Sequence, residues 1–240
     1  ARRMVAAVEA GTWEASDVYA RAQEVLNVAA ASADLPAPTP YDLDEHHALA
    51  TRIASEAITL LRNEYDALPL SSGTSVALIG DLADTPRYQG AGSSQVNPTR
   101  LETPRELLEA GGESARGLAL TGYAPGYERH GGTSDALIAE AVALAARADV
   151  ALVYVGLDEL AESEGLDRTH MRLPEGQDRL IEAVVAANPR TIVVLTGGAS
   201  VEMPWASSVP ALVNGYLGGQ GGAGAMLDVL TGVVNPSGRL

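Results

Sequence analysis

Short apolar runs alternate with amphipathic helical patterns through most of the chain. The apolar runs have the length of buried strands and lie at residues 76–80, 118–122, 149–156, 191–196 and 210–216. The helical patterns lie between them, at residues 103–111, 133–147, 174–187 and 222–230. A further helix is predicted over residues 45–63, with an apolar stripe made of Leu49, Ile53, Ala57 and Leu60. This alternation predicts an α/β fold, a mainly parallel sheet sandwiched between helices.

The N-terminal part of the chain follows a different pattern. Residues 1–33 contain two helical segments separated at Gly11, and Ser16 is the expected N-cap of the second. Residues 34–44 carry three prolines close together, which favours an extended linker over a helix. The predicted organisation is therefore a short helical segment at 1–33, a proline-rich linker at 34–44 and an α/β domain at 45–240. Both ends of the chain lack a terminal element, which favours a piece of a larger polypeptide.

Composition excludes several classes of protein. The formal net charge of −15 opposes binding to nucleic-acid phosphates, so no nucleic-acid partner is expected. All 16 basic residues are arginines, which excludes a Schiff-base lysine and the lysine of a phosphate-binding loop. The absence of cysteine excludes disulfides and thiolate chemistry, and leaves both cytoplasm and secretion open. No apolar run approaches the ~18 residues needed to cross a bilayer, so no membrane partner is expected.

An acidic loop directly follows the strand predicted at 149–156. It carries Asp158, Glu159, Glu162, Glu164 and Asp167. In parallel α/β sheets, ligands bind just beyond the carboxyl ends of the strands. A carboxyl group that is partly desolvated beside other carboxylates has a raised pKa, which suits a proton donor. Spacing alone also fits a solvated acidic loop on an acidic protein.

Three other segments are candidates for a site. Residues 88–94 (YQGAGSS) follow a strand and could approach a polar ligand, or could form a plain turn. The glycines of residues 217–222 precede a helix and favour close packing over anion binding. His46 and His47 are adjacent on a helix and favour a structural role, while His130 and His170 could each line a cleft. No metal site and no cofactor are predicted.

Several of these segments occur together and in the order found in one family. They are ASEAITLLRNEYDALPL (54–70), VALIGDLAD (76–84), YQGAGSSQVNP (88–98), ESEGLDRTHMRLPEGQDRLIEAV (162–184), GGASVEMPW (197–205), YLGGQGG (216–222) and NPSGRL (235–240). Residues 45–240 resemble the second, α/β-sandwich domain of glycoside hydrolase family 3, and most closely its β-glucosidases. Residues 1–33 resemble the closing helices of that family's first, barrel-type domain.

The resemblance implies retaining hydrolysis of terminal β-D-glucosides, in which an aspartate nucleophile and a second carboxyl group cooperate. It implies that Glu164 is the general acid/base, with Glu162 as the alternative. It also implies that Asp167 and Arg168 order the loop, and their adjacency in the sequence favours a local ion pair between them. Ser93, Ser94 and Arg168 are the expected substrate-binding residues, with the serines on the outer side of the cleft.

The chain departs from the family pattern because nothing in residues 1–33 matches the nucleophile's motif. The nucleophile is therefore expected on a barrel domain outside this chain, either on a separate polypeptide or elsewhere in a larger one. The isolated chain is expected to be inactive. The alternative from another class is a non-catalytic α/β module that binds sugar or stabilises a partner. A nucleotide-binding domain is disfavoured by the acidity and by the missing lysine.

Overall fold

The computed structural model describes residues 2–33, 35–36 and 40–240. The chain forms two compact units, the first ending at Asp42 and the second running from Leu43 to Leu240. This division falls inside the predicted linker at 34–44, of which residues 34 and 37–39 lie outside the described residues.

The first unit consists of two helices, α1 (Arg2–Glu9) and α2 (Ala15–Ala33). Neither helix has a buried residue, and apolar side chains such as Val25 and Leu26 are mostly exposed. Helix α2 begins one residue before the predicted N-cap, Ser16, which therefore lies within the helix. Among the described residues, no helix in either unit is long and apolar enough to cross a membrane.

The second unit is built around one six-stranded sheet with the order β1-β6-β5-β4-β2-β3. Its strands are β1 (Thr59–Asn63), β2 (Ser75–Ile79), β3 (Ala119–Ala124), β4 (Val150–Gly156), β5 (Thr191–Thr196) and β6 (Ala211–Asn214). Every neighbouring pair is parallel except β1 and β6, which are antiparallel. All seven residues of the central strand β4 are buried, as expected for a strand covered on both faces.

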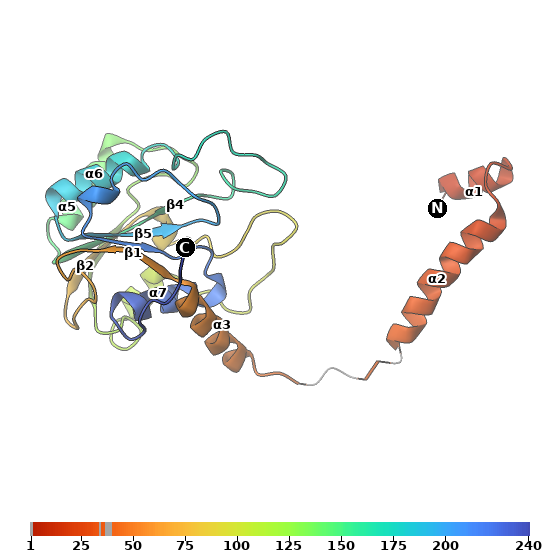
Figure 1. Cartoon of the computed structure of the whole chain (residues 1–240), viewed down its shortest axis with the longest axis horizontal. Helices are drawn as coiled ribbons and strands as arrows, with labels where there is room; N and C mark the ends of the chain where they lie inside the picture. The colour runs from red at the N-terminus through yellow and green to blue at the C-terminus, as the bar shows by residue number, and fades with distance from the viewer. Residues whose placement is uncertain (1, 34, 37–39) are drawn as a thin grey trace. The chain divides into compact units, whose positions relative to one another are not determined.

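Helices cover both faces of this sheet, and the predicted sandwich is confirmed (Figure 1). The helices are α3 (Leu43–Ala57), α4 (Pro104–Ala110), α5 (Asp135–Ala145), α6 (Gln177–Ala187) and α7 (Gly222–Leu230), with short 3-10 turns η1 (Asp81–Ala83), η2 (Ala206–Ser208) and η3 (Gly219–Gly221). One core includes Leu78, Val194 and Leu227 of α7. The other includes Val153 and Leu180 of α6. Successive side chains along each strand point to opposite faces of the sheet, so the strands contribute to two separate apolar layers.

The helix predicted over residues 45–63 is wrong in its second half. Helix α3 ends at Ala57, and residues 59–63 form β1, an edge strand that pairs with β6. The predicted apolar stripe is also wrong, because Leu49 and Ile53 are exposed and the buried residues of α3 are His47, Ala54 and Ser55. Small side chains on that face allow α3 to approach η3 and α7 closely.

Other predicted boundaries hold to within a few residues. Helix α4 begins at Pro104 after the N-cap Thr103, as the Thr-Pro pair predicts. Thr103 and Glu106 form a reciprocal capping box, in which each side chain bonds the other residue's backbone N–H. The helix predicted from residue 174 begins at Gln177 instead.

Candidate active site

The buried side chain of Gln177 fixes the carboxyl end of β4, where the acidic loop begins. Its Oε1 accepts from the backbone N–H of Gly156 at 2.9 Å, and its Nε2 donates to the Gly156 carbonyl at 3.1 Å. Gly156 has a φ of 157°, and a Cβ there would lie 1.8 Å from the Thr196 carbonyl oxygen. The loop therefore leaves the sheet at a defined point, where only glycine fits. The sequence analysis did not identify Gln177, because a glutamine in a predicted helix gives no sign of a functional role.

Asp158 anchors the first turn of the acidic loop. One carboxylate oxygen accepts from the backbone N–H groups of Leu160 and Ala161, at 3.0 and 2.7 Å. The other lies 3.2 Å from Nδ1 of His130. Asp158 is buried and its four lone-pair directions are largely used, so it acts as a structural anchor of the loop.

Glu159 belongs to a second polar cluster beside the loop. Both of its carboxylate oxygens lie 3.1 Å from Nε of Arg129, whose Nη1 donates to Asp81 at 2.8 Å. Partial burial disfavours the charged form of Glu159, but hydrogen bonds from Arg129 outweigh it, so its pKa lies below the usual value. Glu159 is therefore ionised and forms an ion pair with Arg129.

Glu162 forms an ion pair with the buried guanidinium of Arg87. Its carboxylate also accepts from the backbone N–H of Gly198 at 2.9 Å. Arg87 donates further to the carbonyls of Leu157 at 3.2 Å and of Glu162 itself at 2.7 Å. Glu162 thus ties the acidic loop to the segment after β2 and to the segment after β5. The sequence analysis did not identify Arg87, because an arginine in the segment after the strand at 76–80 gives no sign that its side chain is buried.

Glu164 is exposed and contacts the glycine- and serine-rich segment that was singled out at residues 88–94. Its Oε2 accepts from the backbone N–H of Ser93 at 2.7 Å and from the Ser93 hydroxyl. The Glu164 backbone N–H donates to the Ala91 carbonyl at 3.3 Å. Gly92, with a φ of 102°, lies so close that a Cβ there would be 2.7 Å from the Glu164 Cβ. The structure therefore brings together two of the predicted segments, although 71 positions separate Ser93 from Glu164.

The pKa of Glu164 is shifted in the direction opposite to the sequence-based expectation. Hydrogen bonds from the hydroxyl and the backbone N–H of Ser93 favour the charged carboxylate and lower its pKa. The expected increase required desolvation beside other carboxylates. In this chain Glu164 is exposed, and the neighbouring Glu159 and Glu162 are each paired with an arginine.

Arg168 orders the far end of the loop, but by a different contact from the one predicted. Its guanidinium donates to the Ser200 carbonyl at 2.9 Å and reaches the Arg172 carbonyl at 3.4 Å. Within the described part of the chain it makes no ion pair with Asp167. Ser94 is exposed and lies next to Ser93, on the outer surface of the same segment.

His130 and His170 both line an open groove of about 1090 Å³ beside the acidic loop. Asp158 and Arg168 also line it. In residues 2–33, 35–36 and 40–240, no three His, Asp or Glu side chains gather so that they could hold a metal ion.

His47 is buried, with Nε2 at 3.5 Å from Glu102 and Nδ1 at 3.0 Å from the Gln220 amide, which fits a structural role. The glycines before α7 serve packing, since a Cβ on Gly221 would meet Thr51 at 2.4 Å.

Known proteins resemble this chain in sequence and in fold. The family model for the glycosyl hydrolase family 3 C-terminal domain matches residues 58–240. Thermostable β-glucosidase B of Acetivibrio thermocellus is 48% identical over 202 residues, covering 83% of this chain and 26% of that protein. An exo-α-(1→6)-L-arabinopyranosidase of Bifidobacterium longum is 39% identical over 211 residues, covering 83% of this chain and 27% of that protein.

Solved structures agree with these relatives. The crystal structure of a Bifidobacterium adolescentis family 3 β-glucosidase matches with a TM-score of 0.79 and 36% identity, over 98% of this chain and 34% of that one. A β-glucosidase of Streptomyces venezuelae, solved in complex with D-glucose, matches with a TM-score of 0.77 and 28% identity, over 86% of this chain and 39% of that one. The chain belongs to glycoside hydrolase family 3, and residues 58–240 are its C-terminal domain. It spans between about a quarter and two fifths of the length of these relatives.

Proposed function

We propose that this chain is the acid/base-bearing portion of a retaining β-glycosidase that hydrolyses terminal β-D-glucosides. The observation that carries the proposal is the exposed Glu164 carboxylate, held by Ser93 on a loop beyond the carboxyl edge of the sheet. The 48% identity to a β-glucosidase over most of the chain supports the substrate class.

Glu164 has two tasks in this mechanism. It protonates the leaving glycosidic oxygen, and it then removes a proton from the water that hydrolyses the glycosyl-enzyme. The nucleophile is an aspartate on a barrel domain outside this chain, with its carboxyl group roughly 5–5.5 Å from that of Glu164. A second carboxylate at that distance and the exclusion of water both raise the pKa of Glu164. These two effects oppose the hydrogen bonds from Ser93 and would allow Glu164 to hold a proton near neutral pH.

The neighbouring residues would shape the outer part of the cleft. Ser93 orients the Glu164 carboxylate, and Ser94 presents a free surface beside it for the leaving group. Arg168 supports the loop through the Ser200 carbonyl and lies on the wall of the adjacent groove. We assign these three residues to substrate binding. Glu162 is the alternative acid/base residue, but its ion pair with Arg87 disfavours that role.

Two features concern the whole protein. Residues 1–33 would be the closing helices of the barrel domain, consistent with exposed apolar side chains along α1 and α2. The isolated chain would then be inactive, and taken alone it would act as a non-catalytic α/β module.

The second candidate for the sugar is an α-L-arabinopyranoside, because relatives named for that activity are 39% identical.

Complementation tests this proposal. The chain is assayed alone and then mixed with the barrel domain of the Acetivibrio thermocellus relative, on an aryl β-glucoside and on cellobiose. Activity is expected only in the mixture. Glu164→Gln should then reduce kcat/KM on cellobiose by about 10²–10⁴-fold, and reduce it less on an aryl glucoside whose leaving group needs no proton.

The matched control is Glu182→Gln, an exposed glutamate on α6 away from the loop, which should leave both rates unchanged. Equal losses on both substrates for Glu164→Gln would indicate a structural glutamate. Activity of the chain alone would place a nucleophile within these 240 residues and contradict the mechanism. No activity in the mixture would favour the non-catalytic module.

A further inference from the structure

The loop after β3 extends across the end of β2 to the acidic loop. In the sheet, β2 lies between β3 and β4 and is parallel to both, so a segment that leaves β3 meets the exit of β2 before that of β4. This segment consists of residues 125–134, which connect β3 to α5. It carries Arg129 and His130, and each of them contacts a carboxylate of the acidic loop.

Arg129 binds both of the segments that meet at Glu164. Its Nε lies 3.1 Å from each carboxylate oxygen of Glu159, on the acidic loop. Its Nη1 donates to the Asp81 carboxylate at 2.8 Å and to the Thr85 carbonyl at 2.7 Å, both on the segment after β2. The side chain is 21% exposed, so these bonds are partly shielded from water. Because a guanidinium is planar and rigid, one side chain fixes the spacing between the two segments near the sheet.

The loop that carries Arg129 is itself fixed to the sheet. Tyr127 is buried, and its Oη donates to the Tyr154 carbonyl of β4 at 2.9 Å and accepts from the Leu82 N–H of η1 at 3.3 Å. The backbone then closes a tight turn at residues 128–132, with hydrogen bonds of 2.7 and 3.1 Å. Arg129 therefore extends from a turn that is anchored to β4 and to η1.

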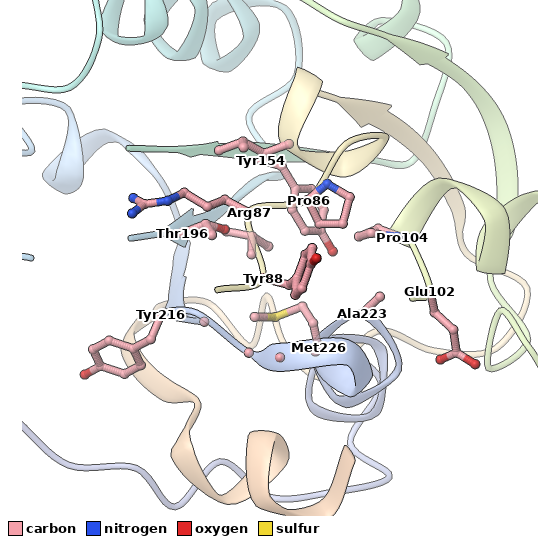
Figure 2. Close-up of a pocket in the computed structure, with 16 residues that line it drawn as sticks. Pro86, Arg87, Tyr88, Glu102, Pro104, Tyr154, Thr196, Tyr216, Ala223 and Met226 are labelled. Atoms are coloured by element: carbon pink, nitrogen blue, oxygen red, sulfur yellow. The ribbon is translucent and has the colours of Figure 1, made fainter. Parts of the chain in front are cut away.

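The segment after β2 stays close to β4 as it continues beyond the contact with Arg129. Pro86 and Arg87 line a pocket together with Tyr154 of β4 (Figure 2). The guanidinium of Arg87 binds carbonyl and carboxylate groups of the acidic loop, so Arg87 joins the two segments to each other. Arg129 differs from Arg87 because it binds both segments from a third loop, which fixes their position relative to the sheet.

We propose that Arg129 is a positioning residue for Glu164. It fixes the spacing between the acidic loop and the segment after β2 at their base, and this spacing brings the Ser93 hydroxyl to the Glu164 carboxylate. Within the described residues Arg129 has no ion pair with Glu164, so it acts through the backbone of the two segments. The consequence for catalysis rests on the proposed function, in which Glu164 is the acid/base residue, whereas the positioning itself does not.

Arg129→Gln tests the proposal on the full chain. Without the guanidinium the two segments can separate, so Ser93 donates less to Glu164 and the pKa of Glu164 should rise toward its ordinary value. Carboxyl-carbon NMR titration measures this shift in the absence of any partner. An unchanged Glu164 pKa would overturn the proposal.

Glu159→Ala separates geometry from charge, and it also provides the test if Arg129→Gln does not fold. Removing a negative charge from the acidic loop by itself lowers the pKa of Glu164, because like charges disfavour ionisation of a carboxyl group. Releasing the acidic loop from Arg129 raises that pKa. We therefore expect a rise, and a lowered or unchanged pKa of Glu164 would contradict the positioning role.

Arg116→Gln is the matched control. Arg116 is 25% exposed, and it binds the Asp228 carboxylate and two carbonyls, those of Glu113 and Ser114. It precedes β3, at the opposite end of the sheet from the acidic loop. Arg116→Gln should lower stability to urea by a similar amount and leave the pKa of Glu164 unchanged. The same rise in this variant as in Arg129→Gln would assign the shift to a general loss of stability and overturn the proposal.

Activity distinguishes this inference from the proposed function. In the mixture with the barrel domain of the Acetivibrio thermocellus relative, Arg129→Gln should reduce kcat/KM on cellobiose by up to about 10²-fold, and less on an activated aryl glucoside. An equal loss on both substrates would mean that Arg129 supports the fold and not the acid, against the proposal. If no mixture is active, the proposed function fails, and the titration of Glu164 still decides the positioning.

Discussion

The Glu164 carboxylate accepts two hydrogen bonds from Ser93, one from its hydroxyl and one from its backbone N–H at 2.7 Å. This pair joins the loop after β4 to the segment after β2. Both residues lie at the surface, so the contact orients a carboxylate without burying it.

The first prediction follows from that pair. Ser93→Ala removes the hydroxyl donor and keeps the backbone donor, so the pKa of Glu164 should rise toward its ordinary value. Carboxyl-carbon NMR titration of the chain measures it directly. Because the folded-state pKa is depressed, the contact stabilises the fold above the unfolded-state pKa, and this contribution is lost as the pH falls through the folded-state value.

Ser94→Ala is the control for this titration. The neighbouring Ser94 is exposed like Ser93, and its substitution should leave the pKa of Glu164 unchanged. An unchanged pKa in Ser93→Ala would contradict the assignment of the shift to the hydroxyl.

The second prediction concerns the ion pair between Arg87 and Glu162. Arg87 is 4% exposed at its side chain and Glu162 is 21% exposed. Glu162→Gln leaves a buried guanidinium without its carboxylate, which should lower the free energy of unfolding by about 2–4 kcal/mol, somewhat less than for a fully buried pair. Urea unfolding monitored by Trp205 fluorescence provides the measurement.

Glu109→Gln is the comparison for that loss. Glu109 pairs with Arg105 across one helical turn at 2.8 Å, and both side chains are about a third or more exposed. Such a surface pair contributes roughly 0.5 kcal/mol or less. If Glu162→Gln cost no more than Glu109→Gln, the pair would not hold the loop.

The third prediction concerns the close approach at Gly92. An alanine there must adopt a φ of 102° and place its Cβ 2.7 Å from the Glu164 Cβ. Gly92→Ala should therefore cost backbone strain and also displace Glu164 from Ser93, which raises the Glu164 pKa. The measurements are urea unfolding and the carboxyl titration described above.

Gly73→Ala separates the two effects. Gly73 also has a left-handed φ, 84°, but a Cβ there meets nothing within 4 Å. It should cost about 1 kcal/mol of strain and leave Glu164 unaffected. Equal stability losses with an unshifted Glu164 pKa in both variants would rule out the steric contact.

Local patterns in the sequence were sufficient for most of the architecture. The alternation of apolar runs and helical patterns predicts the parallel sheet and its covering helices, because periodicity depends on neighbouring residues only. Thr103 and Pro104 mark the start of α4 for the same reason. The ordered motifs indicated the family to which the chain belongs. The sequence also indicated the acidic loop after β4 as the candidate site.

Contacts between distant segments were decided by the tertiary structure. Residues 59–63 form a strand because β6 offers an edge to pair with, although their local pattern continues that of a helix. Glu164 has a lowered pKa because folding places Ser93 beside it, and Arg87 is buried because three carbonyl and carboxylate groups surround it. Spacing along the chain contains no information on such partners, since they meet only when the strands between them pack into one sheet.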